Sequence, residues 1–345
     1  MARKKRAKQG KPLPAVMVDL IIGYAVSKLV HVVAKLGIAD LLKGGPKSPA
    51  ELARSAGVDP QTLHRVLRAL ASVGVFAERK DRRFALTPLA ATLRSDRPDS
   101  MRAFAIMMAD DHNWQAWADL LHSVKTGQTA FDHAHGAKFF EYLGKHPDKA
   151  RVFGEAMTSI SGAENPAVVA AYDFSRVRTL VDVGGSHGHM LAAILKANPK
   201  LEGILFDLPQ VLEQARSAPY VTAREIAGRI ELAPGDFFQS VPAGADPYIM
   251  KYIIHDWTDD LCVTILQNCR RAMAPNARVL VVDTVIPPGN DPHWGKLLDI
   301  NMLVVPGGRE RTRTEFAQLF ARAGLKLKRV VPTACPLSIV EAVSA

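Results

Sequence analysis

Residues 179–196 read TLVDVGGSHGHMLAAILK, and this stretch decides the fold. A short apolar run, 179–183, leads into a glycine-rich turn of the order G-G-x-x-G, and an apolar helical pattern follows at once. Glycine allows a tight turn and a close approach of the backbone to a ligand at such a connection. The stretch predicts the first strand and helix of a nucleotide-binding sheet, although the turn alone is also consistent with a simple tight connection.

Short apolar runs continue to alternate with helical segments up to the carboxyl terminus. Buried runs that alternate with helices are typical of a doubly wound, mainly parallel sheet of the Rossmann type, with helices on both faces. We therefore expect residues 166–345 to form an α/β domain. Its further strands are predicted at 203–208, 229–232, 248–254, 278–283, 326–331 and 337–343.

The preceding part of the chain predicts a mainly helical domain with a winged-helix pattern. Apolar residues recur at helical spacing over 16–42, which indicates a buried helix that is apolar on most sides. Ser48 and Glu51 have the spacing of a capping box, and Asp59-Pro60 starts another helix. Alternating residues at 75–78 and 83–86 then predict a hairpin. We expect a basic tail at 1–15, a winged-helix domain at 16–100 and a helical connector at 101–165.

Composition excludes several classes of protein. The 345 residues carry a net charge of +10, but six Lys and Arg lie among the first eleven residues, which leaves the body at about +4. The tail indicates a solvated arm, with a polyanion contact as the alternative. No secretory signal and no apolar run of about 20 residues is evident, so we expect no membrane association. Three cysteines without paired spacing favour a cytoplasmic protein.

Two carboxylates follow the next strands, and a third lies beside the turn. Asp207 ends the second strand, where an acid binds ribose hydroxyls in many nucleotide-binding sheets, and Asp236 ends the third, where it can accept from an adenine amino group. Asp182 would repel a pyrophosphate but attract an ammonium and a sulfonium. The acids therefore favour S-adenosylmethionine over a dinucleotide.

Five segments, in this order and spacing, resemble the S-adenosylmethionine-dependent O-methyltransferases of the plant caffeate and hydroxyindole type and their bacterial small-molecule relatives. They are LVDVGGSHGHMLAAIL, LFDLP, PGDFF, MKYIIHDWTDD and GGRERTRTEF. The resemblance implies a homodimer joined through the winged-helix domain. It also implies methyl transfer from S-adenosylmethionine to a phenolic hydroxyl of a small aromatic compound, without a metal.

The resemblance assigns the cofactor site residue by residue. The implied contacts are Gly184, Asp207, Leu208, Asp236, Phe237 and Lys251, with Ser161 near the methionine end of the cofactor. The turn adds Asp182, Gly185 and Gly188 to these candidates. Ser186 departs from the family, which usually has a third consecutive glycine there, and a positive φ at this position would strain a serine.

The catalytic candidates follow strands four and five, at the edge where ligands bind in open α/β sheets. A histidine at position 255 is also consistent with a packed or capping residue, but in the H-D-W motif the resemblance implies that His255 is the general base. Asp283 and Glu310 are the implied orienting acids. Asp283 is one methylene shorter than the family's usual glutamate, so Glu310 is expected to contribute more to orienting the imidazole. The alternative for Glu310 is a surface salt bridge with Arg309 or Arg311.

The remaining candidates concern the acceptor and metals. Phe153, Met157, Asp256, Trp257 and Met302 resemble the lining of the family's acceptor pocket, although such residues are core residues at least as often. The pairs His133/His135 and His187/His189 lack a third ligand at a diagnostic spacing, so we expect no metal site.

Two other function classes remain open at this point. The same fold can methylate nitrogen or carbon, or carry out another reaction on a bound aromatic compound. A winged-helix DNA-binding regulator is the second alternative, because the helix at 60–72 carries His64, Arg65 and Arg68. The same helix is rich in leucine, as a helix buried in a dimer would be, so a nucleic-acid partner is not expected.

Overall fold

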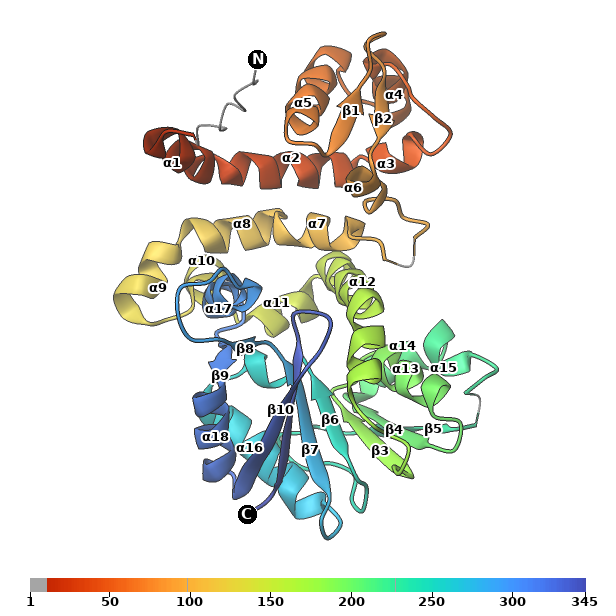
Figure 1. Cartoon of the computed structure of the whole chain (residues 1–345), viewed down its shortest axis with the longest axis vertical. Coiled ribbons are helices and arrows are strands. Elements are labelled where there is room, and N and C mark those ends of the chain that lie inside the picture. Colours follow the sequence, from red (N-terminus) through yellow and green to blue (C-terminus); the bar gives the residue numbers. More distant parts are fainter. Residues whose placement is uncertain (1–10, 98, 227) are drawn as a thin grey trace, which may run out of the picture. The chain divides into compact units, whose positions relative to one another are not determined.

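The computed structural model describes residues 11–97, 99–226 and 228–345 (Figure 1). The chain divides between Asp110 and Asp111 into two compact units. This division lies ten residues after the expected boundary at 100, and the boundaries at 100 and 165 remain predictions. The connector is split, because α7 (Arg102–Met108) lies in the first unit and α12 (Pro147–Ala171) runs through position 165 with Pro166 inside it.

The first unit contains the expected winged helix. Its helix-turn-helix is α4 (Pro49–Ala56) followed by α5 (Pro60–Ser72), and the wing is the antiparallel pair β1 (Phe76–Glu78) and β2 (Phe84–Leu86). The capping box of Ser48 and Glu51 is formed, and Asp59 accepts from the Thr62 backbone N–H. Two short helices, α3 (Ile38–Leu41) and α6 (Pro88–Ala91), complete the unit with α7.

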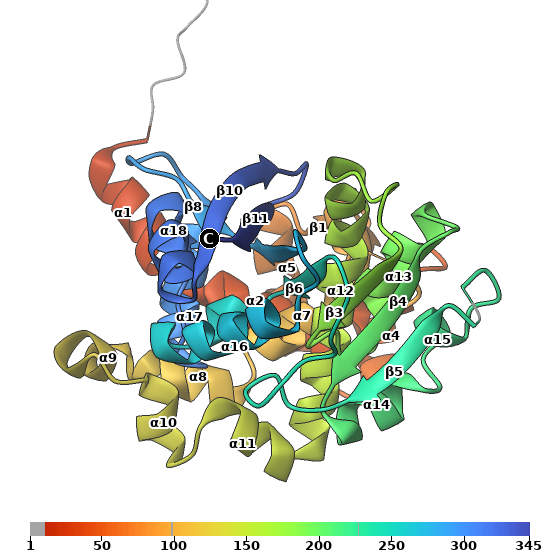
Figure 2. The same ribbon diagram turned by 90° about the horizontal axis from the view of Figure 1, so that it is seen from below.

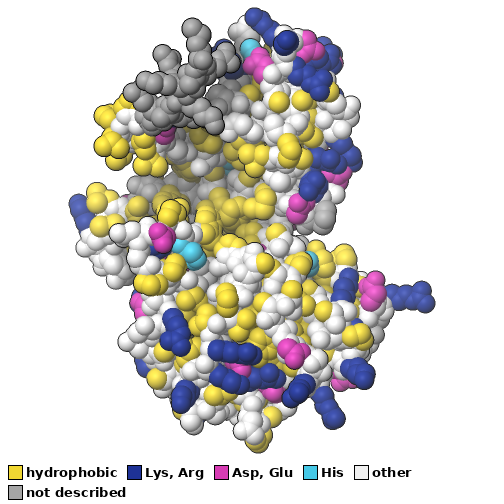
Figure 3. Space-filling view, viewed as in Figure 1, with side chains coloured by type: hydrophobic (Ala, Val, Ile, Leu, Met, Phe, Trp, Pro, Cys, Tyr) yellow, Lys and Arg dark blue, Asp and Glu magenta, His cyan; other side chains and the backbone are white. Residues whose placement is uncertain are grey.

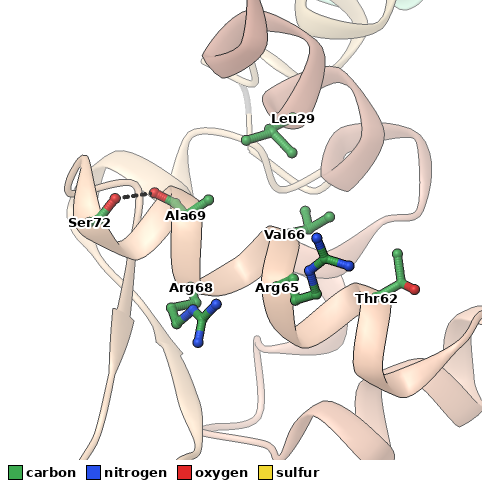
Figure 4. A pocket seen from close by; sticks show the side chains of 7 residues that line it. All are labelled: Leu29, Thr62, Arg65, Val66, Arg68, Ala69 and Ser72. Atoms are coloured by element: carbon green, nitrogen blue, oxygen red, sulfur yellow. Dashed lines mark hydrogen bonds between the residues drawn. The ribbon is translucent and has the colours of Figure 1, made fainter. Parts of the chain in front are cut away.

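Helix α5 buries its leucines and presents its arginines. Leu67 and Leu70 are fully buried in the core of the unit. Arg65 and Arg68 line a groove of about 530 Å³ together with Leu29 of α2 (Gly23–Lys35) (Figure 4). The apolar side of this helix thus packs against its own unit, as the sequence indicated.

The first apolar segment differs from its prediction. It forms α1 (Leu13–Ile21) and α2, and α1 begins inside the expected tail, whose residues 1–10 lie outside the described part of the chain. In α1, every residue of which is described, none is buried; Leu20 in α1 is 71% exposed and Tyr24 in α2 is 63% exposed. Figure 3 shows hydrophobic side chains gathered over this region. By length and composition Leu13–Lys35 could cross a membrane, which corrects the expectation that no such run exists.

The second unit carries the predicted sheet. Seven strands run in the order β10-β11-β7-β6-β3-β4-β5, parallel except for the antiparallel β10 and β11. They are β3 (Thr179–Val183), β4 (Glu202–Asp207), β5 (Ile230–Pro234), β6 (Tyr248–Lys251), β7 (Arg278–Asp283), β10 (Leu325–Pro332) and β11 (Ser338–Ser344). All seven predicted strands exist, with small shifts at their ends.

Helices cover both faces of this sheet, as a doubly wound fold requires. On one face, Val181 and Val281 pack with residues of α16 (Asp259–Ala272) and α18 (Arg313–Arg322). On the other, Leu180 and Leu280 pack with α12, α13 (His189–Ala197) and α14 (Pro209–Ala215). Figure 2 shows α16 and α18 on the side of the sheet opposite to α12 and α13. The other helices are α8 (Asp111–Ala118), α9 (Leu120–Thr126), α10 (Ala130–His135), α11 (Phe139–Lys145), α15 (Pro219–Thr222) and α17 (Trp294–Val304).

One short pairing was not predicted. β8 (Val285–Ile286) lies parallel to β9 (Arg311–Thr312), just beyond the carboxyl end of β7. Because β9 directly follows residue 310, this pairing brings a distant part of the chain to the edge of the sheet where ligands bind in such folds.

Candidate active site

The glycine turn after β3 is shaped by close contacts. Gly184 has φ +70°, and a Cβ there would lie 2.5 Å from the Ile253 side chain. At Gly185 a Cβ would lie 2.7 Å from the Asp182 carboxyl carbon, and Gly188 has φ +77°. Ser186 has φ +52°, so the predicted strain at this departure from the family is present. The turn needs glycine for its backbone, and Ser186 is accommodated at a cost.

The carboxylate of Asp207 holds this turn against the end of β4. It accepts hydrogen bonds from the backbone N–H groups of Ser186, at 2.8 Å, and Leu208, at 2.7 Å. Burial raises the pKa of Asp207. After β5, Asp236 accepts from the Phe238 N–H at 2.8 Å, which fixes the segment that carries Phe237. Both acids thus order the loops that the sequence assigns to the cofactor.

Asp182 lies buried beneath the turn. Burial, and then the nearby charge of Asp207, raise the pKa of Asp182 to about 7. Among the residues that the structure describes, none forms a hydrogen bond with its Oδ2. A cationic ligand would relieve both the repulsion and the missing partner, whereas a pyrophosphate would add to the repulsion. The residues therefore fit S-adenosylmethionine and do not fit a dinucleotide.

Lys251, at the end of β6, contacts helix α12. Its Nζ lies 3.0 Å from Ser161 Oγ and 2.9 Å from Glu164 Oε2. The structure therefore brings together Lys251 and Ser161, which are far apart in the sequence. Glu164 was missed by the sequence analysis, because an acid within a long helix gives no signal that it is buried.

His255 is the centre of a buried acidic cluster. It lies in the short 3-10 helix η1 (Ile254–Asp256) after β6. Its Nδ1 is 2.7 Å from Glu310 Oε1 and its Nε2 is 3.5 Å from Asp256 Oδ1. The alternative for Glu310 is wrong, since Arg309 pairs with Glu315 and the Arg311 side chain with Asp259. A carboxylate only accepts, so Nδ1 donates and Nε2 remains to take up a proton.

The acids around His255 set its proton affinity. Burial alone would lower the pKa of His255, but Asp256, then Glu310 and Asp283, outweigh burial and raise this pKa to about 10. Burial has the opposite effect on the acids, since it raises the pKa of Asp256 to about 6 and that of Asp283 to about 7. The cluster therefore stabilises the imidazolium, so His255 is in its neutral, proton-accepting form chiefly above this pKa.

Asp283 does not orient His255 directly. Its Oδ1 accepts from the Tyr252 backbone N–H at 3.0 Å. Within the described chain, no hydrogen bond or ion pair joins Asp283 to His255. The shorter side chain of Asp283 therefore bonds the backbone beside His255 and not the imidazole, and its role as an orienting acid remains a prediction. Glu310 is the acid that bonds to the ring.

A loop from positions 307–311 locks the His255 segment in place. The buried Arg311 guanidinium donates to the carbonyls of Ile254, at 2.9 Å, and Trp257, at 3.1 Å. At Gly308 a Cβ would lie 1.9 Å from the His255 carbonyl oxygen, so only glycine fits there. Neither role was predicted, because both depend on the approach of a segment about fifty residues away in the sequence.

Aromatic side chains gather next to this segment. Trp257 lies 5.7 Å from Phe140 in a stacked arrangement and 4.9 Å from Phe238, and Phe140 contacts Phe153 at 6.2 Å. Trp257 and Phe153 are thus linked through Phe140, which the sequence analysis had not assigned. Met157 is half-buried on α12 and Met302 is buried on α17, and their roles in a pocket remain predictions.

The two histidine pairs do not act as pairs. His135 bonds the His112 carbonyl, and His189 bonds the Asn165 amide. His133 instead lies 2.5 Å from Asp119 and stacks on His122, and these three groups offer ligand atoms within 4.8 Å of one another. The Asp119–His133 contact already satisfies both groups at the surface of α8–α10, away from the sheet edge.

Comparisons with known proteins identify the family. The O-methyltransferase domain family matches residues 117–326, and the O-methyltransferase dimerisation domain matches residues 18–96. The phenazine O-methyltransferase PhzM of Lysobacter antibioticus is 47% identical over 331 residues, which cover 96% of both chains.

Two crystal structures have the same fold. That of LaPhzM has a TM-score of 0.92 at 47% identity, covering 97% of this chain and 100% of that one. The SAH-bound form of CalO1, a methyltransferase in calicheamicin biosynthesis, has a TM-score of 0.86 at 37% identity, covering 98% of this chain and 100% of that one. The chain therefore belongs to the S-adenosylmethionine-dependent O-methyltransferases that carry an amino-terminal dimerisation domain.

Proposed function

We propose that this enzyme methylates a phenolic hydroxyl of a small aromatic compound, with His255 as general base and without a catalytic metal. The observation that carries the proposal is the buried His255–Glu310 pair, with 2.7 Å between Nδ1 and Oε1, at the carboxyl edge of the sheet. It lies in the same strand-end segment as Lys251, which the family resemblance assigns to the cofactor. Base and cofactor site are therefore neighbours.

The chain's residues divide the chemistry between them. A bound S-adenosylmethionine supplies an electrophilic methyl group. Asp182 and Asp207 favour its positive charge, Asp236 and Phe237 hold its nucleoside part, and Lys251 with Ser161 faces its methionine end. A neutral phenol, with a pKa of ~10, is a weak nucleophile until its proton is drawn off. His255 Nε2 accepts that proton, and Glu310 stabilises the resulting imidazolium.

The acceptor side favours a flat aromatic compound. Trp257, two residues after His255, belongs to an aromatic cluster with Phe140 and Phe153, and aromatic side chains of this kind pack well against planar aromatic ligands. Asp256, near Nε2, is placed to accept from a second hydroxyl. The phenazine specificity named for the Lysobacter relative supports an acceptor of this class.

We further propose that the enzyme is a cytosolic homodimer. Leu20, Ile21 and Tyr24 expose apolar surface in the single chain, within the segment that matches the dimerisation domain. A second copy of the chain would bury this surface. The sparse cysteines fit a reducing compartment.

The test is His255→Asn with labelled cofactor and a panel of phenols, catechols, hydroxyindoles and phenazines. Asparagine keeps polarity but takes up no proton, so turnover falls by about 10²–10⁴-fold while cofactor affinity stays unchanged. His64→Asn, in the first unit, is the matched control and keeps full turnover. A His255→Asn enzyme with near-normal turnover on an unactivated phenol would falsify the role of the base. Methylation of aromatic amines alone would show that nitrogen is the acceptor.

A further inference from the structure

Tyr252 has a backbone conformation that few residues other than glycine adopt. Its φ is +57°, in the left-handed region, between β6 and η1. Two hydrogen bonds hold it there, since its N–H reaches Asp283 Oδ1 at 3.0 Å and the Val282 carbonyl at 3.3 Å. Strain of this kind persists where the surrounding structure enforces it, and it concentrates at functional sites.

The strained backbone presents the Tyr252 side chain to His255. The phenol ring stacks on the imidazole, with 4.9 Å between ring centroids and 25° between planes. The Tyr252 hydroxyl donates to Glu164 Oε1 at 2.7 Å, and Lys251 Nζ lies 4.7 Å from the ring centroid. Burial, and then Glu164, raise the pKa of Tyr252, so the hydroxyl keeps its proton and remains a donor.

The geometry points to Tyr252 as a positioning residue, whose ring fixes the plane of the His255 imidazole and ties it to the Ser161–Glu164–Lys251 cluster. This inference rests on the proposed role of His255. Glu310 holds the imidazole at Nδ1 by one hydrogen bond, and Asp256 Oδ1, 3.5 Å from Nε2, adds only a long contact, so these two acids alone leave the plane of the ring free to turn. A stacked ring removes this freedom, so Nε2 keeps one direction. The role of Asp283 becomes indirect, through the backbone of Tyr252.

Glu164 connects Tyr252 with Lys251, which the family resemblance assigns to the cofactor. Its carboxylate accepts from the Tyr252 hydroxyl through Oε1 and pairs with Lys251 through Oε2. A cofactor that contacts Lys251 and Ser161 would therefore lie next to Glu164. The Glu164 carboxylate is in turn bonded to Tyr252, whose ring packs on His255. Asp256, Glu310 and Asp283 are the charged groups around His255, and none of them is altered by a change at Tyr252.

The test uses two substitutions in the full-length enzyme. Tyr252→Gly removes the ring and suits the positive φ, so the backbone is not strained further. Tyr252→Phe keeps the ring and removes only the bond to Glu164. Because a small misplacement of a reacting group can cost ~10²-fold in rate, kcat falls about 10²-fold in the glycine variant and less in the phenylalanine variant. The Kd of S-adenosylmethionine, measured by calorimetry, changes less than about threefold.

The matched control is Tyr248→Phe, in strand β6, which directly precedes Tyr252. Tyr248 is fully buried, and its hydroxyl donates to the carbonyls of Pro242 and Ala272, away from the site. This variant loses stability but keeps its kcat. If the substitutions acted only through a general loss of packing, stability would fall in all three variants. The kcat would then not decrease in the order wild type, Tyr252→Phe, Tyr252→Gly.

Proton NMR of the His255 ring gives a readout that does not depend on activity. A stacked phenol ring shifts the Cε1–H resonance of the imidazole by its ring current, so this signal moves in Tyr252→Gly and stays close to its place in Tyr252→Phe. An unmoved signal, or a wild-type kcat in the glycine variant, overturns the inference. Turnover retained in His255→Asn overturns the proposed base instead, whatever the NMR signal does.

Discussion

Glu310→Gln separates two effects of the acid that bonds to His255. Glutamine has the same length but no charge, so the imidazolium loses a charged partner at Nδ1. A hydrogen bond to a charged group contributes ~1.5–3 kcal/mol, and one pKa unit corresponds to ~1.4 kcal/mol. We therefore expect the pKa of His255, raised to about 10 in the wild type, to fall by ~1–2 units. The same energy is lost from the transition state, so the maximal rate falls by ~10–100-fold.

The lower pKa and the lower maximal rate change the pH profile in different ways. A lower pKa moves the acid limb of kcat toward lower pH, while the plateau drops. The profile is measured from pH 6 to 11 with saturating cofactor and one phenol for every variant, so that ionisation of the acceptor cancels in the comparison. Glu213→Gln, whose side chain is 77% exposed, is the control and leaves the profile unchanged. A limb that stays in place or moves to higher pH in Glu310→Gln refutes the assignment of Glu310.

Three further predictions concern the cofactor turn and the dimer. Asp207→Ala removes a charged acceptor and weakens cofactor binding by ~1–3 kcal/mol in calorimetry, and an unchanged affinity would contradict the assignment of Asp207. Ser186→Gly relieves the strain at φ +52° and raises the free energy of unfolding in urea by up to ~1 kcal/mol, and an unchanged or lower value would contradict the strain. Leu20→Glu charges a side chain that is 71% exposed in the single chain, so the chain still folds but sediments as a monomer; a persistent dimer would place the interface elsewhere.

The sequence predicts those parts of the site that are local. The glycine turn, Asp207 and His255 each follow a strand directly, and the carboxyl ends of parallel strands meet at one edge. Their positions could therefore be inferred once the strands were recognised. At Ser186 the family's usual glycine raised the question of a positive φ, and the structure has φ +52° there.

Contacts between distant segments could not be predicted in this way. Phe140 meets Trp257, and Arg311 bonds the carbonyls around His255, only because the chain between them folds back over the sheet edge. The family resemblance implies that Asp283 is an orienting acid, but the sequence does not say whether its shorter side chain reaches the imidazole, and in the structure it bonds the Tyr252 backbone. The exposure of α1 was missed for another reason, since an apolar pattern indicates burial but does not say whether the same chain provides the partner.

The distribution of charge connects folding with function at this site. The protein is basic overall, yet acids gather at the carboxyl edge of its sheet: Asp182, Asp283 and Glu310 are buried, and Asp207 and Asp256 are half-buried. Burying like charges together costs folding free energy, as the raised pKa of Asp182 indicates. We propose that a bound S-adenosylmethionine would offset this cost at Asp182 and Asp207, because its sulfonium and ammonium groups are positive, and that its thioether product, which has lost the sulfonium charge, would offset less of it. These two acids would then favour the methyl donor over the product and so promote release after transfer.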